Sequence, residues 1–302
     1  MAKLINLILF TANKYMINPN ILYQITTALG EPIKNINAVA GSDINSVYSI
    51  NTNKGKYIMK LNSRDKYPGM FKLEQEGLQA ISNTATIKVP HVILNGDTAK
   101  ESFLLMEHIA SRRPTTESLR LLGIQLAAMH KCSSTAFGWH NNNYIGSLRQ
   151  LNNKRNTWTD FYIEQRLQPL VKIAFNRALL SNADLKNFEA LYKRLPNLFE
   201  EEQPSLVHGD LWSGNYLIAE DESPYLIDPA VHYGHREMDI AMSALFGGFG
   251  DDFYRAYNEV YSLNYNWTER IDLWNLYPLL VHVNLFGRCY FAQLQANLKK
   301  YL

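Results

Sequence analysis

A loop in the C-terminal third of the chain carries a carboxylate and an amide at a spacing that suits phosphoryl transfer. Residues 208–215 read HGDLWSGN and follow the short segment SLV at 205–207, so Asp210 and Asn215 stand five positions apart on a loop that leaves a strand. In kinases the carboxylate of such a loop meets the acceptor hydroxyl, and the amide oxygen reaches the metal ion that bridges the nucleotide phosphates. The spacing predicts these two roles for Asp210 and Asn215.

The segment that follows predicts a β-hairpin that delivers a second carboxylate. Two apolar runs flank a polar turn within residues 216–227, and the hairpin ends at Asp228. This side chain would lie beside Asn215 and complete an oxygen-ligand site for a hard cation. An isolated pair such as His208 and Asp210 often only supports a turn, but the added amide and carboxylate favour catalysis. We expect His208 to hold the loop backbone and to transfer no proton.

A cation for the nucleotide phosphates is expected on a strand of the N-terminal region. Lys60 lies in the run 57–61, and Glu74, fourteen positions later, lies on a predicted helix from which it can pair with the lysine. Glu76 is the rival, but two positions along a helix are about 200° apart, so both glutamates cannot face Lys60. A lone lysine on a strand is usually a solvated edge residue. The spacing to Glu74 favours the functional interpretation instead.

Two further segments are candidates for nucleotide contacts. The turn at 40–47 contains Gly41, which permits close approach of backbone N–H groups to phosphate, and Ser42, which adds a hydroxyl donor. A single glycine is also typical of an ordinary hairpin. The extended segment 103–109 offers backbone donors and acceptors to an adenine edge, with Met106 at the back of the pocket. A plain connector between domains is the alternative for this segment.

The elements that must position these residues fall into two regions. Before residue 109 the patterns predict helices at 20–29 and 70–82 and strands at 36–40, 47–52, 57–61, 90–94 and 103–106, with a turn at 95–97. After it they predict helices ending near 130 and at 158–178, 185–195, 253–261 and 273–298. The fold class is therefore α+β: a small antiparallel β lobe with one key helix, a larger mainly helical lobe, and a cleft between them. The predicted boundaries are 1–15 for an N-terminal extension, 16–106, 107–109 for a hinge, and 110–302.

Composition excludes several classes of protein. The chain has 302 residues, 46% hydrophobic and 19% charged, which excludes disorder. Its net charge of +2 predicts neither nucleic-acid binding nor a polybasic membrane surface. The apolar run at 4–10 is too short to span a membrane. With only Cys132 and Cys289, no disulfide framework is expected, and we expect a reduced, cytoplasmic protein.

The motifs together resemble a known family. The HGDLWSGN loop, the segment IDPAV at 227–231 and its continuation to residue 241 are similar to the fructosamine kinase (ketosamine-3-kinase) family, as are the upstream segments 137–146 and 158–167. The resemblance spans roughly residues 20 to 300. The family belongs to the aminoglycoside-phosphotransferase-like branch of the protein-kinase fold, so the same two-lobed fold is implied here.

The resemblance also implies roles and a reaction. Asp210 would be the catalytic base, Asn215 and Asp228 would bind Mg²⁺, Lys60 with Glu74 would hold the ATP phosphates, and Glu107, His108 and Ile109 would form the adenine-binding hinge. The reaction implied is ATP-dependent phosphorylation of the 3-hydroxyl of a ketosamine, carried by a free amine or by a glycated protein. The unstable product then releases the amine and reverses glycation. Asp43 stands where some relatives carry cysteine, and His232 where an aromatic residue is commoner.

The acceptor is a polyol that carries a secondary amine, so its subsite should combine a carboxylate with flat aromatic faces. Trp158, Phe161, Trp212 and Tyr233 are the candidates, and each could equally belong to the core of the helical lobe. A kinase for an aminoglycoside or a choline-like amine is the alternative activity, although such acceptors usually need several acidic side chains, and the region from residue 251 is apolar and aromatic. A pseudokinase used as a binding module is a further alternative, which the intact set of catalytic and metal residues disfavours.

Overall fold

The computed structural model describes residues 17–40 and 44–302, and these pack as two compact units. The first unit runs to Glu76 and includes Pro90–Ala110, and the second contains Gly77–Val89 and Ser111–Leu302. Residues 77–89 thus pack with the second unit, although they lie inside the predicted N-terminal region 16–106. The predicted extension 1–15 and the turn residues Gly41 and Ser42 lie outside the described residues.

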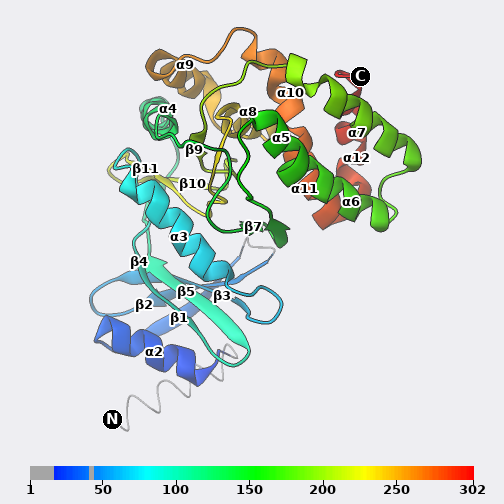
Figure 1. Cartoon of the computed structure of the whole chain (residues 1–302). Helices are drawn as coiled ribbons and strands as arrows, with labels where there is room; N and C mark the ends of the chain where they lie inside the picture. The colour runs from blue at the N-terminus through cyan, green and yellow to red at the C-terminus, as the bar shows by residue number, and fades with distance from the viewer. Residues whose placement is uncertain (1–16, 41–43) are drawn as a thin grey trace. The chain divides into compact units, whose positions relative to one another are not determined.

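A five-stranded antiparallel sheet forms the centre of the first unit (Figure 1). Its strands are β1 (Asn35–Val39), β2 (Ser46–Asn51), β3 (Lys56–Ser63), β4 (Val92–Asp97) and β5 (Glu101–Glu107), in the order β1-β2-β3-β5-β4. In the register of β3 with β5, Lys60 stands opposite Leu104. All five predicted strands are confirmed.

Two helices occur among these strands along the chain, one before β1 and one between β3 and β4. Helix α2 (Pro19–Leu29) is capped by the Asn18 side chain and ends at Gly30, whose φ of 66° is the left-handed conformation that glycine adopts readily. Its buried face joins side chains of the sheet in one hydrophobic cluster. Helix α3 (Met70–Asn83) carries Glu74. Both helices agree with the predicted ones to within a residue.

The turn predicted at 95–97 is wrong, because β4 continues through Asp97 and the chain turns at 98–100. The hydrogen bond from the Thr98 N–H to the Glu101 carbonyl, 2.7 Å long, closes the turn. Gly96, which suggested a turn, instead lies within the strand where a Cβ atom would stand 2.7 Å from the Phe103 ring. A glycine in a strand can mark such a close approach as well as a turn.

Helices make up most of the second unit. The α-helices are α4 (Thr116–His130), α5 (Trp158–Phe161), α6 (Gln168–Asn176), α7 (Asn182–Arg194), α8 (Glu237–Leu245), α9 (Gly250–Val260), α10 (Ile271–Trp274), α11 (Leu276–Phe286) and α12 (Phe291–Lys299). A π-helical segment, Tyr162–Leu167, joins α5 to α6, and 3₁₀ turns cover Leu195–Asn197, Trp267–Arg270 and Gly287–Tyr290. With the antiparallel sheet of the first unit, this confirms the α+β class.

Two features of the helical unit differ from the prediction. The single helix expected at 273–298 is broken, because Gly287 has φ 79° and ψ −151°, a conformation that no helix accommodates. Helix α8 was not predicted from hydrophobic periodicity. It is buried on nearly all sides, so its sequence lacks the polar face by which a surface helix is recognised.

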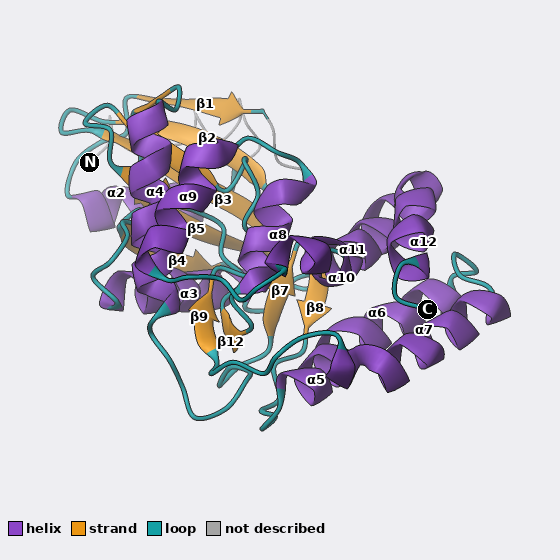
Figure 2. Ribbon diagram, turned by 90° about the horizontal axis from the view of Figure 1, so that it is seen from above, coloured by secondary structure: helices purple, strands orange, loops and turns teal. Residues whose placement is uncertain are grey.

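The second unit also contains short strands that pair with one another, several of which are labelled in Figure 2. They are β6 (Ser111–Arg112), β7 (Asn143–Ile145), β8 (Leu148–Gln150), β9 (Ser205–Val207), β10 (Tyr216–Ala219), β11 (Pro224–Leu226) and β12 (His232–Gly234). They pair antiparallel as β11-β10-β6, β12-β9 and β7-β8. The hairpin predicted between Asn215 and Asp228 is confirmed as β10 and β11. Among the described helices, none combines the length and the apolar character that a membrane span needs.

Candidate active site

A buried carboxylate of α8, Asp239, holds the loop that follows β9. Its Oδ2 accepts the His208 N–H at 2.6 Å and its Oδ1 accepts the Gly209 N–H at 2.9 Å. The same carboxylate lies 3.1 Å from Nε2 of His130 in α4, whose Nδ1 lies 2.8 Å from the Tyr257 hydroxyl. Burial alone would raise the pKa of Asp239, but the hydrogen bond and charge of His130 lower it below its usual value. An ionised, fully bonded side chain therefore anchors the first two residues of the loop.

His208 makes two further contacts within this loop. Its Nε2 lies 2.9 Å from the Ile227 carbonyl and its Nδ1 accepts the Asp210 N–H at 3.2 Å. Burial lowers the pKa of His208, so the neutral imidazole donates from Nε2 and accepts at Nδ1. As expected, the side chain holds loop backbone.

Asp210 and Asn215 are in direct contact. The Asn215 Nδ2 donates to the Asp210 carbonyl at 2.8 Å and to its Oδ2 at 2.9 Å. Burial raises the pKa of Asp210 to about 7; the hydrogen bond from Asn215 opposes this shift, and the negative charges of Asp228 and Asp239 add to it. A carboxylate with such a pKa can accept a proton near neutral pH.

Asp228 follows the hairpin and is bound closely to the same loop. The Ile227 N–H donates to the Asn215 carbonyl at 3.0 Å, and the Ala230 N–H donates to the His208 carbonyl at 2.9 Å. Asp228 itself has φ 56°, a left-handed conformation that costs a non-glycine residue about 1 kcal/mol or more. The surrounding hydrogen bonds must offset that strain, which is a common situation at functional sites.

Asn215 and Asp228 carry oxygen atoms of the kind that a magnesium ion prefers as ligands. Both hydrogen bonds of the Asn215 side chain use Nδ2, so its Oδ1 is the atom that can ligate a cation. Within the described ranges, no group of three or more His, Cys, Asp or Glu side chains could hold a metal. Mg²⁺ usually takes one or two protein oxygens and completes its octahedron with phosphate and water, so two protein ligands suffice.

In the first unit, Lys60 and Glu74 form a buried ion pair. The Lys60 Nζ lies 2.6 Å from the Glu74 Oε1, and the side chains are 7% and 12% exposed. Strand β3 and helix α3 thus bring the two predicted residues together.

The predicted hinge follows β5 in the same unit. Met106 is buried against Phe71 and Leu104. The Glu107 N–H donates to the His91 carbonyl at 3.0 Å, and the His108 N–H to the Lys56 carbonyl at 3.3 Å. These two donors are therefore used within the unit. Of the three predicted hinge residues, Ile109 is the one whose N–H donates to no backbone carbonyl in the described part of the chain.

The four aromatic residues predicted to contact the acceptor differ in how exposed their side chains are. Trp158 and Phe161 are 0% exposed and pack in the largest hydrophobic cluster of the second unit, so they offer no ring face to a ligand. Burial therefore supports the alternative considered for Trp158 and Phe161, that both are core residues. Trp212 is 39% exposed, and its ring lies over Gly214, where a Cβ atom would be 2.3 Å away. Tyr233 is half-buried, with its ring 5.5 Å from that of Trp139.

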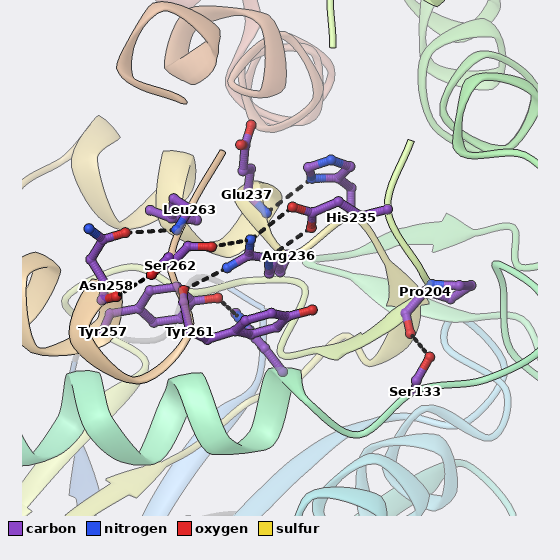
Figure 3. A network of polar contacts seen from close by, with 12 residues as sticks. Ser133, Pro204, His235, Arg236, Glu237, Tyr257, Asn258, Tyr261, Ser262 and Leu263 are labelled. Carbon is purple, nitrogen blue, oxygen red and sulfur yellow. Dashed lines mark hydrogen bonds and ion pairs between the residues drawn. The ribbon is translucent and has the colours of Figure 1, made fainter. Parts of the chain in front are cut away.

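Motif spacing did not single out Asp239 or its partner His130. The available signal was an acidic residue inside the apolar run of α8. Near it in the sequence, Arg236 binds both oxygens of Glu202 at 2.8 Å. Arg236 also stacks on the Tyr261 ring and donates to the Tyr261 carbonyl (Figure 3). Buried ion pairing thus fastens the start of α8 to the rest of the unit.

Comparisons with known proteins agree with this arrangement. The chain matches the model of the family described as "Fructosamine kinase" over residues 17–302. It is 37% identical over 287 residues to a probable ketoamine kinase of Synechocystis sp.. The matched region covers 93% of this chain and 96% of that protein. It is 36% identical to the chloroplastic protein-ribulosamine 3-kinase of Arabidopsis thaliana, with 92% and 86% covered.

Solved structures show the same fold. A Thermobifida fusca protein, provisionally named a fructosamine-3-kinase, superposes with a TM-score of 0.84 at 36% identity and covers 93% of this chain and 98% of its own. A thermostable mutant of the aminoglycoside phosphotransferase APH(4)-Ia superposes with a TM-score of 0.60 at 14% identity, over 91% and 97% of the two chains. The second likeness shows the fold alone, and it confirms the predicted protein-kinase-like architecture. By sequence and by structure, this chain is a phosphotransferase that belongs to the fructosamine kinase family.

Proposed function

We propose that this protein transfers the γ-phosphoryl group of ATP, as its magnesium complex, to the 3-hydroxyl of a ketosamine. The observation that carries the proposal is the backbone-bonded pair of loops that brings Asp210, Asn215 and Asp228 together in a chain of the fructosamine kinase family. The names of its relatives, ketoamine kinase and ribulosamine 3-kinase, support the acceptor class. A same-fold phosphotransferase has been crystallised with AMP-PNP, which supports ATP as donor.

Asp210 is assigned the role of base. It accepts the proton of the acceptor hydroxyl as the oxygen attacks the γ-phosphorus, and ADP leaves. A base works best when its pKa lies near the working pH, and a pKa of about 7 meets that condition. Asn215 Oδ1 and Asp228 would hold Mg²⁺, which would supply positive charge to balance that of the phosphates. The Asn215 side chain would orient both the base and the metal ion, because its nitrogen binds Asp210 and its oxygen is assigned to the cation.

The first unit is assigned to the nucleotide. Lys60, held by Glu74, would neutralise phosphate charge, and Gly41 and Ser42 would contribute donors from their turn. Met106, Glu107, His108 and Ile109 would receive the adenine, with the Ile109 N–H as the donor, since those of Glu107 and His108 are already used.

The acceptor site is assigned to Trp212 and Tyr233, the two candidate aromatics with accessible rings. Trp212 is two residues from Asp210, so its indole can cover the sugar or the amine while the hydroxyl meets the base. Phosphorylation at the 3-position of a ketosamine would lead to loss of the sugar phosphate and release of the amine, which amounts to deglycation of a free amine or a protein.

An ATP-consumption assay with Mg²⁺ and three acceptors tests the proposal. We expect ADP formation with ribulose-lysine or fructose-lysine and none with an aminoglycoside, and phosphorus NMR of the product should place the phosphate at C3. Asp210→Asn should lower kcat at least about 100-fold while ADP still binds. Turnover of the aminoglycoside alone would favour the alternative activity. Failure to turn over any acceptor, with ADP bound normally, would favour the binding-module interpretation.

A further inference from the structure

A buried network of polar side chains lies next to the loop that carries Asp228. Its members, all 5% exposed or less, are Asn143, Gln150, Asn152, Arg166 and Tyr277. Buried polar side chains cost free energy unless they are hydrogen-bonded, and each of these makes at least one hydrogen bond. So many polar groups in a core position suggest a task that apolar side chains could not perform.

The short hairpin of β7 and β8 supplies the two central members. Asn143 stands directly opposite Gln150 in the register, so both side chains point to the same face. The Gln150 Nε2 donates to the Asn143 Oδ1 at 2.7 Å and to the Ala230 carbonyl at 3.0 Å. The Asn143 Nδ2 donates to the Val231 carbonyl at 2.9 Å. Two side-chain amides thus bind consecutive carbonyls of one chain segment.

That segment is the continuation of the proposed metal loop, since only Pro229 separates Ala230 from Asp228. The Ala230 N–H is bonded to the His208 carbonyl, so Gln150 and the loop that carries Asp210 hold the two polar backbone groups of the same residue. Because Pro229 has a fixed φ, restraint at Ala230 passes directly to Asp228. The left-handed φ of Asp228 makes such restraint necessary, since a strained residue keeps its conformation only where its surroundings enforce it.

The outer members of the network determine which way the two amides point. The Tyr277 hydroxyl donates to Gln150 Oε1, which leaves Nε2 to face the carbonyl. Burial raises the pKa of Tyr277, so its phenol stays protonated and remains a donor. Asn152 Nδ2 donates to Asn143 Oδ1 at 2.8 Å, and the Arg166 Nη2 donates to Asn152 Oδ1 at 2.8 Å. A flipped amide would set oxygen against oxygen at Ala230 or Val231.

We propose that Gln150 and Asn143 are positioning residues that hold Asp228 in place for the metal–nucleotide complex, and that Tyr277 acts through Gln150. The inference rests on the proposed function, because it assigns the cation to Asp228. It predicts that changes in the network weaken Mg²⁺-dependent nucleotide binding, whereas binding without the metal is unaffected.

Calorimetric titration with ADP, in the presence of Mg²⁺ and separately in EDTA, tests the proposal on the full-length protein. The readout is the ratio of the two ADP affinities, accompanied by the melting temperature. Tyr277→Phe removes one hydroxyl and keeps the ring, so we expect the ratio to fall about fivefold, which corresponds to one hydrogen bond. Gln150→Met should lower it about tenfold or more, and adding Tyr277→Phe to that variant should change it no further, since Tyr277 acts only through Gln150.

A matched control lies in the same core cluster. The buried Tyr162 hydroxyl lies near Tyr277, but it donates to the Leu273 carbonyl at 2.8 Å and to the Trp274 carbonyl at 3.2 Å rather than to an amide of the network. Tyr162→Phe should lower the melting temperature about as much as Tyr277→Phe but leave the affinity ratio unchanged. An unchanged ratio in Tyr277→Phe and Gln150→Met, or equal losses in the control, would overturn the inference. If the wild-type ratio is itself close to one, or Asp228→Ala preserves it, then the metal assignment in the proposed function is at fault instead.

Discussion

The contact between Gly209 and Ala230 provides a sharp test of how the loop that carries Asp210 and the loop that carries Asp228 are held together. A Cβ atom at position 209 would lie 2.2 Å from the Ala230 carbonyl oxygen, whereas real Cβ atoms essentially never come within 3.0 Å of another heavy atom. Both atoms involved are backbone or fixed to it, so Gly209→Ala must push the two loops apart by roughly 1 Å. The φ of Gly209, 84°, adds strain for any other residue.

These two effects give the expected magnitudes. A left-handed φ costs alanine about 1 kcal/mol and overpacking a rigid site costs about 1–3 kcal/mol, so the free energy of unfolding should fall by about 2–4 kcal/mol. A displacement of roughly 1 Å between reacting groups typically lowers the rate about 100-fold, and we expect that loss in kcat. Urea unfolding followed by circular dichroism and a coupled ADP-release assay with a ketosamine measure the two quantities.

Gly30→Ala is the matched control, because it isolates the conformational strain. Gly30 has φ 66° and no atom lies within 4 Å of the place that a Cβ would occupy, so only about 1 kcal/mol of stability should be lost, with kcat unchanged. If Gly209→Ala keeps kcat within about threefold of the wild type at a temperature where both variants are folded, close backbone packing of the two loops is not what positions Asp228.

Three further predictions concern pH, the tryptophans and the nucleotide. Burial lowers the pKa of four histidines in the second unit: His208, His232, His235 and His282. The unfolded chain binds their protons below about pH 6.5 while the folded chain resists them, so the free energy of unfolding should fall by up to about 1.4 kcal/mol per pH unit for each histidine as the pH drops. Equal urea midpoints at pH 7.5 and 5.5 would contradict this. Trp158→Ala should cost about 3–5 kcal/mol of stability, whereas Trp212→Ala should leave stability nearly unchanged and raise the KM for the ketosamine, and a reversal of that pattern would overturn their assignment. Lys60→Met should raise the KM for ATP but not for the acceptor, as initial-rate measurements with each substrate varied would show.

Local patterns in the chain were sufficient to predict much of the candidate site. Asp210, Asn215 and Asp228 lie within nineteen residues of one another, on a loop and a hairpin whose geometry depends on nearby sequence. The pairing of Lys60 with Glu74 was also predictable, because a strand followed by a helix brings side chains at that spacing together. Such contacts depend on short-range geometry, so residue type and spacing indicate them directly.

The supports of the site could not be predicted in this way. Asp239 meets His130 across 109 positions and Tyr277 meets Gln150 across 127, and no local pattern records which of many polar residues will be brought together in the core. The burial of individual side chains could not be predicted from local patterns either. Trp158 and Trp212 are both tryptophans in family-like segments, but the first lies at 0% exposure within the core and the second remains accessible on the loop.

The sequence by itself determined the type of chemistry, because an Asp, an Asn and a hairpin-borne Asp in that order and spacing suit phosphoryl transfer. The tertiary structure decided how these groups are held, through the backbone contact of Gly209 with Ala230 and the anchoring carboxylate of Asp239. The physical reason is that residue types and short spacings define which groups can react, whereas the orientation and burial of those groups depend on distant segments that pack against them.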